Sequence, residues 1–150
     1  MREILFRAKR LDNGEWAEAM SIAKNEMMDG GSVWFIGAGQ PASQWTNEHG
    51  NMVSVETTGE CLFYACDHKT IGQFTGLTDK NGTKIFEGDI VHVHDRLLRC
   101  DKPYHEFDGV IEHKDGSFVI VGEVMTHYRW LDYDVTVLGN IHDNPELLEV

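Results

Sequence analysis

Short apolar runs separated by turn-forming residues fill the second half of the chain. Apolar residues within 74–77 and 84–86 flank Asn81-Gly82, and these two residue types tolerate the positive φ angles of a tight hairpin turn. The pattern therefore predicts a β-hairpin with a two-residue turn at Asn81-Gly82. The Glu-Gly-Asp sequence at 87–89 predicts a second turn, because glycine frees the backbone and aspartate can cap its own loop.

Valine and histidine alternate directly after this second turn. Successive side chains of a β-strand point to opposite faces, so Val91 and Val93 share one face while His92 and His94 share the other. We expect the two valines to be buried and the two histidines to face solvent.

Further strands are predicted towards the C-terminus. Residues 107–113 and 117–121 predict two strands joined by a turn at Asp115-Gly116, and residues 135–139 predict the last strand. The sequence NPELL at 144–148 places Asn and Pro where a helix N-cap and first helical residue would be, which predicts a short helix.

The N-terminal region predicts a strand, a turn and a return strand. Residues 4–9 alternate in a way that turns Ile4 and Phe6 inward, residues 12–14 favour a turn, and residues 15–17 begin the return strand. Residues 33–36 predict a short buried strand.

Residues 18–28 allow two interpretations. Helical spacing of Ala19, Ile22, Ala23 and Met27 favours a helix, whereas a strand over 17–23 fits the sequence as well. In either case the chain is predicted to be mainly β, with one or two short helices, because short strands linked by turns indicate a sandwich or barrel.

Three segments, in the same order along the chain, resemble the YopX-like family of phage and prophage proteins. They are MREILFRA at 1–8, FTGLTDKNGTKIFEGDIV at 74–91 and VLGNIHDNPELL at 137–148. Lys9 stands where the family usually has tryptophan, which is a small departure, and residues 9–70 match no family motif.

The resemblance implies a YopX-like fold with an SH3-like, partly open barrel. It further implies one domain over 1–150, with the barrel in 71–150, the strands of 1–17 pairing with it, and a variable insert over about 18–70. The family has no established biochemical activity, so the resemblance brings no catalytic residues.

The charge of the chain restricts the classes of partner. The net charge is −12, and residues 71–150 contain 15 acidic against 7 basic side chains. Such a surface repels phosphate backbones and anionic membranes, so a nucleic-acid partner is not expected. The sequence has no apolar run long enough to span a membrane and no signal-peptide pattern, and its three cysteines are an odd number. We expect the protein in the cytoplasm of the host cell, away from the membrane.

His92 and His94 are the candidate metal ligands. Two imidazoles that share a strand face could both reach one ion, although a solvent-exposed strand face that happens to carry histidine is the simpler explanation. The residues that could add a further ligand are His113, His127, Asp89 and Asp95.

Other reactive residues follow no established pattern. Cys61, Cys66 and His68 have a spacing that matches no common zinc motif, and Cys100 is distant. Asp132 and Asp134 could form an acid–base pair. Aromatic and basic side chains near the C-terminus could stack on bases or simply cover the end of a barrel; these are Tyr128, Arg129, Trp130 and Tyr133.

We therefore predict a non-enzymatic phage accessory protein that uses no cofactor and binds a protein partner or itself. The binding surface is expected on an exposed sheet or in residues 9–70, of which 45–59 are the most polar and turn-rich. An apolar patch of Trp34, Phe35 and Ile36 would favour self-association. The alternatives are a module that binds or mimics nucleic acid, and a metal-dependent enzyme built on His92 and His94.

Overall fold

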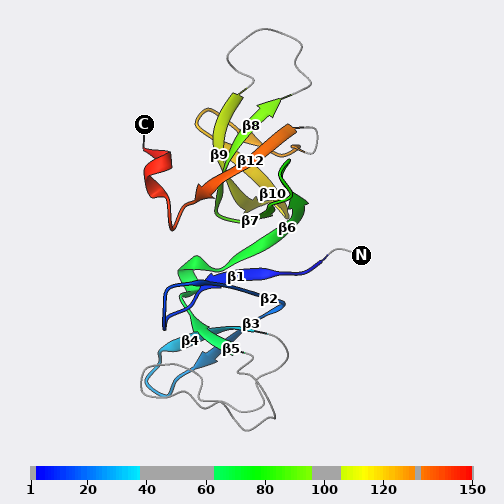
Figure 1. Ribbon diagram of the computed structural model, residues 1–150. Coiled ribbons are helices and arrows are strands. Elements are labelled where there is room, and N and C mark those ends of the chain that lie inside the picture. Colours follow the sequence, from blue (N-terminus) through cyan, green and yellow to red (C-terminus); the bar gives the residue numbers. More distant parts are fainter. Residues whose placement is uncertain (1–2, 38–62, 96–105, 131–132, 150) are drawn as a thin grey trace. The chain divides into compact units, whose positions relative to one another are not determined.

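The computed structural model describes residues 3–37, 63–95, 106–130 and 133–149, with the side chain of Asp95 left out. The chain divides into two compact units, an N-terminal unit of Met1–Gln73 and a C-terminal unit of Phe74–Val150. Twelve strands and two short 3₁₀ helices make up the regular structure of the described residues (Figure 1), so the protein is mainly β as predicted. No helix in these ranges has the length and apolar content that crossing a membrane requires.

The N-terminal unit contains two groups of antiparallel strands. The strands are β1 (Phe6–Lys9), β2 (Trp16–Ala19), β3 (Ser21–Glu26), β4 (Ser32–Gly37), β5 (Phe63–Cys66) and the start of β6 (Gly72–Thr78). β1 pairs with β2 and with the first two residues of β6, while β4 lies between β3 and β5. Ala8, Ile36 and Cys66 form one small core of this unit, and Phe35, Phe63 and Ala65 form a second.

The helix considered over residues 18–28 is wrong, because β2 and β3 occupy this stretch. Six consecutive residues of β3 pair with β4, and this places Ile22 and Ala23 on opposite faces, each against a different core. Both positions are therefore covered without a helix, and non-local pairing overrides the modest helix propensity of the segment.

Two further expectations for the N-terminal unit are wrong. Ile4 is exposed and Leu5 is buried instead, because β1 begins only at Phe6 and the strand alternation does not extend back to residue 4. Phe35 and Ile36 are fully buried, so with Trp34 they do not form an exposed apolar patch. Self-association through that patch is not available.

The predicted hairpin lies at the start of the C-terminal unit, between β6 and β7 (Lys84–Phe86). Its turn differs from the expected two-residue form. The N–H of Asp79 donates to the carbonyl of Thr83 at 2.8 Å and the N–H of Gly82 donates to the carbonyl of Asp79 at 3.0 Å. With Gly82 at φ 81°, this is a three-residue loop closed by a left-handed glycine, because only Gly82 and not Asn81 has positive φ.

A five-stranded antiparallel sheet forms the rest of this unit, in the order β11-β10-β9-β8-β12. The strands are β8 (Asp89–Asp95), β9 (Glu106–Lys114), β10 (Ser117–Gly122), β11 (Thr126–His127) and β12 (Tyr133–Asn140). Asp115 and Gly116 both have positive φ, at 51° and 80°, which confirms the predicted tight turn between β9 and β10. A 3₁₀ helix, η3 (Pro145–Leu148), follows where the short helix was predicted.

One face of the five-stranded sheet carries the core of the C-terminal unit. Val91 and Val93 are fully buried, as predicted, while His92 and His94 lie on the opposite face. The buried members of this core are Ile85, Val91, Val93, Ile111, Ile120, Trp130 and Val135.

The sheet curls but does not close into a barrel. No backbone pairing joins its end strands β11 and β12 in the part of the chain that the structure describes. Side chains nevertheless meet across the gap, since Nδ1 of His127 on β11 lies 3.3 Å from the hydroxyl of Tyr133 on β12. The rings of His127 and Tyr133 lie 5.7 Å apart between centroids, so an aromatic contact bridges the two ends.

Replacing Gly109 by alanine should destabilise the C-terminal unit. An added Cβ would lie 2.6 Å from Cγ2 of Ile120 and 2.9 Å from the carbonyl oxygen of Val121, which forces two paired strands apart. Overpacking of this kind costs about 1–3 kcal/mol. Urea unfolding of Gly109→Ala should show a lower midpoint, and an unchanged midpoint would contradict the close approach of β9 and β10.

Candidate functional site

The loop of the β6–β7 hairpin is fixed to β12 by the side chain of Asp79. Oδ1 of this carboxylate accepts hydrogen bonds from the N–H groups of Asn81 at 2.8 Å and Thr83 at 2.9 Å. Oδ2 accepts one from the N–H of Val137 on β12 at 3.0 Å. The N–H of Lys80 also donates to the carbonyl of Val135 at 3.2 Å, so the loop covers part of the outer edge of β12.

These hydrogen bonds determine the charge state of Asp79, which is only 7% exposed. Burial tends to raise the pKa of Asp79, but the hydrogen bonds from Val137, Thr83 and Asn81 and the nearby charge of Lys80 outweigh that effect. The pKa of this carboxyl therefore lies below its ordinary value of 3.8. The negative form is the one that holds the loop in place.

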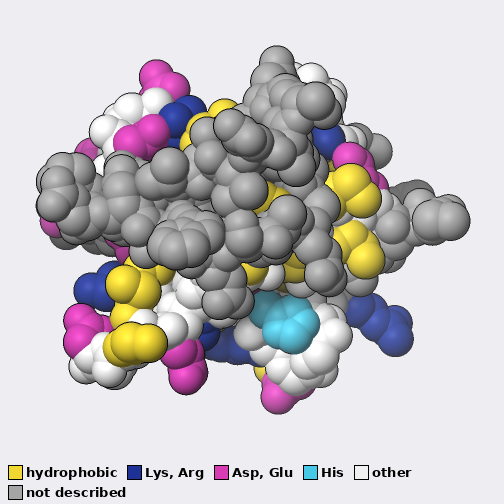
Figure 2. Space-filling view, turned by 90° about the horizontal axis from the view of Figure 1, so that it is seen from below, with side chains coloured by type: hydrophobic (Ala, Val, Ile, Leu, Met, Phe, Trp, Pro, Cys, Tyr) yellow, Lys and Arg dark blue, Asp and Glu magenta, His cyan; other side chains and the backbone are white. Residues whose placement is uncertain are grey.

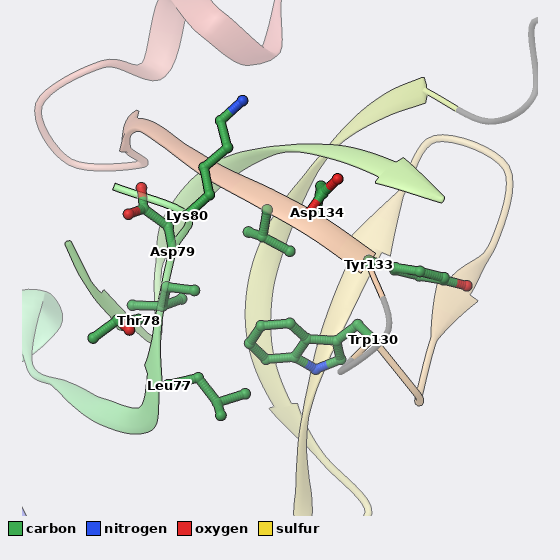
Figure 3. A pocket seen from close by; sticks show the side chains of 9 residues that line it. Leu77, Thr78, Asp79, Lys80, Trp130, Tyr133 and Asp134 are labelled. Atoms are coloured by element: carbon green, nitrogen blue, oxygen red, sulfur yellow. The ribbon is translucent and has the colours of Figure 1, made fainter. Parts of the chain in front are cut away.

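A pocket of about 240 Å³ lies where this loop meets β12. Its walls combine apolar, aromatic and charged side chains, with Leu77 and Trp130 among those that face the hollow and Lys80 extending away from the indole (Figure 3). The lining residues are Leu77, Thr78, Asp79, Lys80, Ile85, Trp130, Tyr133, Asp134 and Val135.

Trp130 is held rigidly at this pocket. The residue is 6% exposed, and its indole N–H donates to the carbonyl of Phe118 at 3.0 Å. The side chain belongs to the core of the C-terminal unit, which agrees with the interpretation that this aromatic segment covers the core. Because the ring is fixed on both its apolar and polar sides, the pocket wall exists before any ligand binds.

The aromatic and basic residues considered for base stacking do not form one platform. Trp130 is buried, and Tyr133 is half-buried beside His127. Tyr128 is exposed, and its hydroxyl donates to Asp115 at 3.1 Å, which raises the pKa of Tyr128 above its ordinary value.

His92 and His94 each pair with a carboxylate on the neighbouring strand β9. Nδ1 of His92 lies 2.7 Å from Asp108, and Nδ1 of His94 lies 3.1 Å from Glu106. The two histidine side chains are 42% and 49% exposed. A carboxylate accepts hydrogen bonds, so Nδ1 is the donor and Nε2 is the ring nitrogen that could bind a metal.

Three of the further ligands considered for a metal do not gather around this histidine pair, and the side chain of Asp95 lies outside the described part of the structure. Asp89 is buried and accepts a hydrogen bond from the N–H of Phe86, while His113 packs against Phe118 and His127 against Phe107. Within the described ranges, no group of three or more His, Cys, Asp or Glu side chains is arranged to hold a metal ion.

The other candidate residues are placed only in part. Cys66 is buried, and burial raises the pKa of its thiol to about 11, so this cysteine is a poor nucleophile at neutral pH. His68 is exposed in a separate short helix, η1 (His68–Thr70). Cys61, Cys100, Asp132 and the polar segment 45–59 lie outside the described residues, and so do residues 96–105.

The pocket was missed in the sequence because its walls come from distant positions. The one available signal was Asp79, which precedes the Asn-Gly dipeptide at a spacing where aspartate often caps its own turn. Charges of both signs are interspersed among the described side chains on the face seen in Figure 2, so that view shows no single-sign patch that would indicate another site.

Replacing Asp79 by asparagine should loosen the loop and the pocket. Asparagine offers one carbonyl oxygen in place of two carboxylate oxygens, so at least one buried N–H loses its partner, at a cost of about 1–3 kcal/mol. Urea unfolding at neutral pH should show this loss, and the exposed substitution Asp108→Asn should not.

The acid dependence of stability should change in the same variant. Because the folded-state pKa of Asp79 is lowered, its contribution to stability is present above the ordinary pKa of 3.8 and is lost as pH falls through the folded value. Asp79→Asn should lack this component in an acid titration followed by circular dichroism. An identical acid profile for both proteins would contradict the assignment.

Metal binding by His92 and His94 stays a prediction. If the pair binds Zn²⁺, titration of the protein with Zn²⁺ should shift the imidazole NMR signals of these two residues, and His92→Gln/His94→Gln should remove the effect. His113→Gln is the matched control. Equal Zn²⁺ binding by the double variant and the unsubstituted protein would rule the pair out.

Comparisons with known proteins place the chain in a family. It is similar to the solved structure titled "Crystal structure of protein EF1440 from Enterococcus faecalis", with 28% sequence identity, a TM-score of 0.50, and coverage of 99% of this chain and 100% of that chain. Among curated proteins none matches. The family described as YopX protein matches residues 5–149. The chain thus belongs to the YopX family, as the three sequence segments had indicated.

Proposed function

We propose that this YopX protein is a non-enzymatic binding module that holds a partner protein at the pocket beside Trp130. The observation that supports the proposal is a pocket that exists before binding, with its loop fixed by Asp79 and its indole wall fixed by Phe118. Preformed hollows with apolar walls and a few polar groups are the usual form of binding sites.

The size of the pocket favours a protein side chain over a cofactor. At about 240 Å³ it is smaller than the roughly 300–1,000 Å³ of typical small-molecule sites. One side chain of a partner fits such a space, and the surrounding surface would carry the remaining contacts. The same argument favours binding over catalysis.

The proposal also includes a partly open, SH3-like barrel and a role as a phage accessory protein. The aromatic contact between His127 on β11 and Tyr133 on β12 supports a partly open, SH3-like barrel in the C-terminal unit. The likeness to phage and prophage proteins supports a role as a phage accessory protein in the cytoplasm of a host cell. The strands of the N-terminal unit and the insert would then form one domain with that barrel.

The test blocks the pocket and leaves the core unchanged. Thr78 is exposed and lines the pocket, so Thr78→Trp should fill it. Thr83→Trp adds the same side chain to the same loop at an exposed position that does not line the pocket. Immobilised protein would be incubated with lysate of phage-infected host cells, and captured proteins quantified by mass spectrometry.

We expect a partner captured by the unsubstituted protein and by Thr83→Trp to fall about tenfold or more with Thr78→Trp, because a blocked anchor pocket removes a large share of the binding energy. A partner that all three proteins capture equally would show that the pocket is not the binding site.

A further inference from the structure

We propose that the segment held at the pocket is a basic stretch of the partner chain, with one anchor side chain in the pocket and cationic side chains beside it. This inference rests on the proposed function and adds the chemistry of the partner. It combines the make-up of the pocket walls with the charges that the strand register places next to them.

The pocket has an apolar wall, with Asp134 and Lys80 among the residues beside it. Leu77, Ile85 and Val135 supply aliphatic surface, and Trp130 supplies the face of a ring. Asp134 is a lining residue, and its carboxylate and the side chain of Lys80 both point away from the indole, while the carboxylate of Asp79 is occupied by its loop and Val137 (Figure 3). Such a site suits an aromatic side chain or the aliphatic stem of lysine or arginine.

Acidic residues on both sides of His94 lie in one row across the exposed face of the sheet, beginning at Asp134. Asp134 on β12 is in register with His94 on β8, and His94 is in register with Glu106 on β9. The next row on the same face contains Asp108, paired in register with His92. Glu106 and Asp108 are 63% and 51% exposed, so both carboxylates are accessible to a ligand.

The spacing of these groups sets a spacing in the partner. Neighbouring strands lie about 4.8 Å apart, so Glu106 is about 10 Å from Asp134, two strands away. An extended chain advances about 3.3 Å per residue, so partner residues that contact Asp134 and Glu106 would lie about three positions apart.

The overall charge favours a basic partner over the other possible occupants. Residues 71–150 carry 15 acidic against 7 basic side chains, and the whole chain has a net charge of −12. Like charge repels a second copy of this chain and a nucleic-acid strand, whereas it attracts a basic segment and speeds its association.

The experiment selects short random peptides, displayed on phage, for binding to the full-length protein, and then measures the affinities of the selected sequences as synthetic peptides. We expect the selected peptides to be enriched in lysine and arginine near an apolar anchor. Glu106→Gln/Asp108→Asn should weaken them by about two- to tenfold, because each exposed charge contributes modestly. Glu146→Gln/Glu149→Gln removes the same charge near the C-terminus and should change the affinity less.

Salt provides a second measurement of the same contact. The difference between Glu106→Gln/Asp108→Asn and the unsubstituted protein should vanish near 1 M salt, where screening acts over only about 3 Å.

The outcomes separate this inference from the proposed function. Peptides that lose binding with Thr78→Trp but contain no excess of lysine or arginine would overturn the basic-segment inference and leave the pocket as the binding site. Peptides that bind Thr78→Trp as well as the unsubstituted protein, or a selection that yields no peptides, would overturn both.

Discussion

The carboxylate of Asp79 is the contact on which the C-terminal unit depends most. It accepts hydrogen bonds from three backbone N–H groups, two in its own loop and one on β12. Without it, the hairpin loop would lose this side-chain hydrogen bond to the five-stranded sheet, and the N–H of Val137 would lose its acceptor. The loop also forms one wall of the pocket, so the same contact holds the hairpin against β12 and shapes the site.

Local features of this fold were readable from the sequence, and non-local ones were not. The turn at Asp115-Gly116 and the alternation of Val91 and His92 depend on neighbouring residues, so residue types alone predicted them. The strand β3 depends on pairing with β4, and a weak helical pattern over the same residues competed with it. A local sequence pattern cannot distinguish a helix from a strand when pairing with a distant strand determines which one forms.

The candidate site was beyond sequence reasoning for the same reason. The hydrogen bond between Asp79 and Val137 joins residues 58 positions apart, and Leu77 and Trp130, which line the same pocket, also come from distant parts of the sequence. His92 and His94 were visible as a pattern, but the partners that the structure gives them, Asp108 and Glu106, lie on another strand. In both cases the sequence did not show which distant residue becomes the partner in the folded protein.

The contacts that hold the hairpin loop in place do not depend on the side chains that surround the pocket. The three hydrogen bonds that the carboxylate of Asp79 accepts come from main-chain N–H groups, which every residue except proline supplies regardless of its side chain. The neighbouring residues Thr78 and Lys80 also line the pocket, but their side chains do not make the hydrogen bonds that hold the loop. Related chains could therefore exchange the chemistry of the pocket lining, and with it their choice of partner, while the scaffold beneath stays the same.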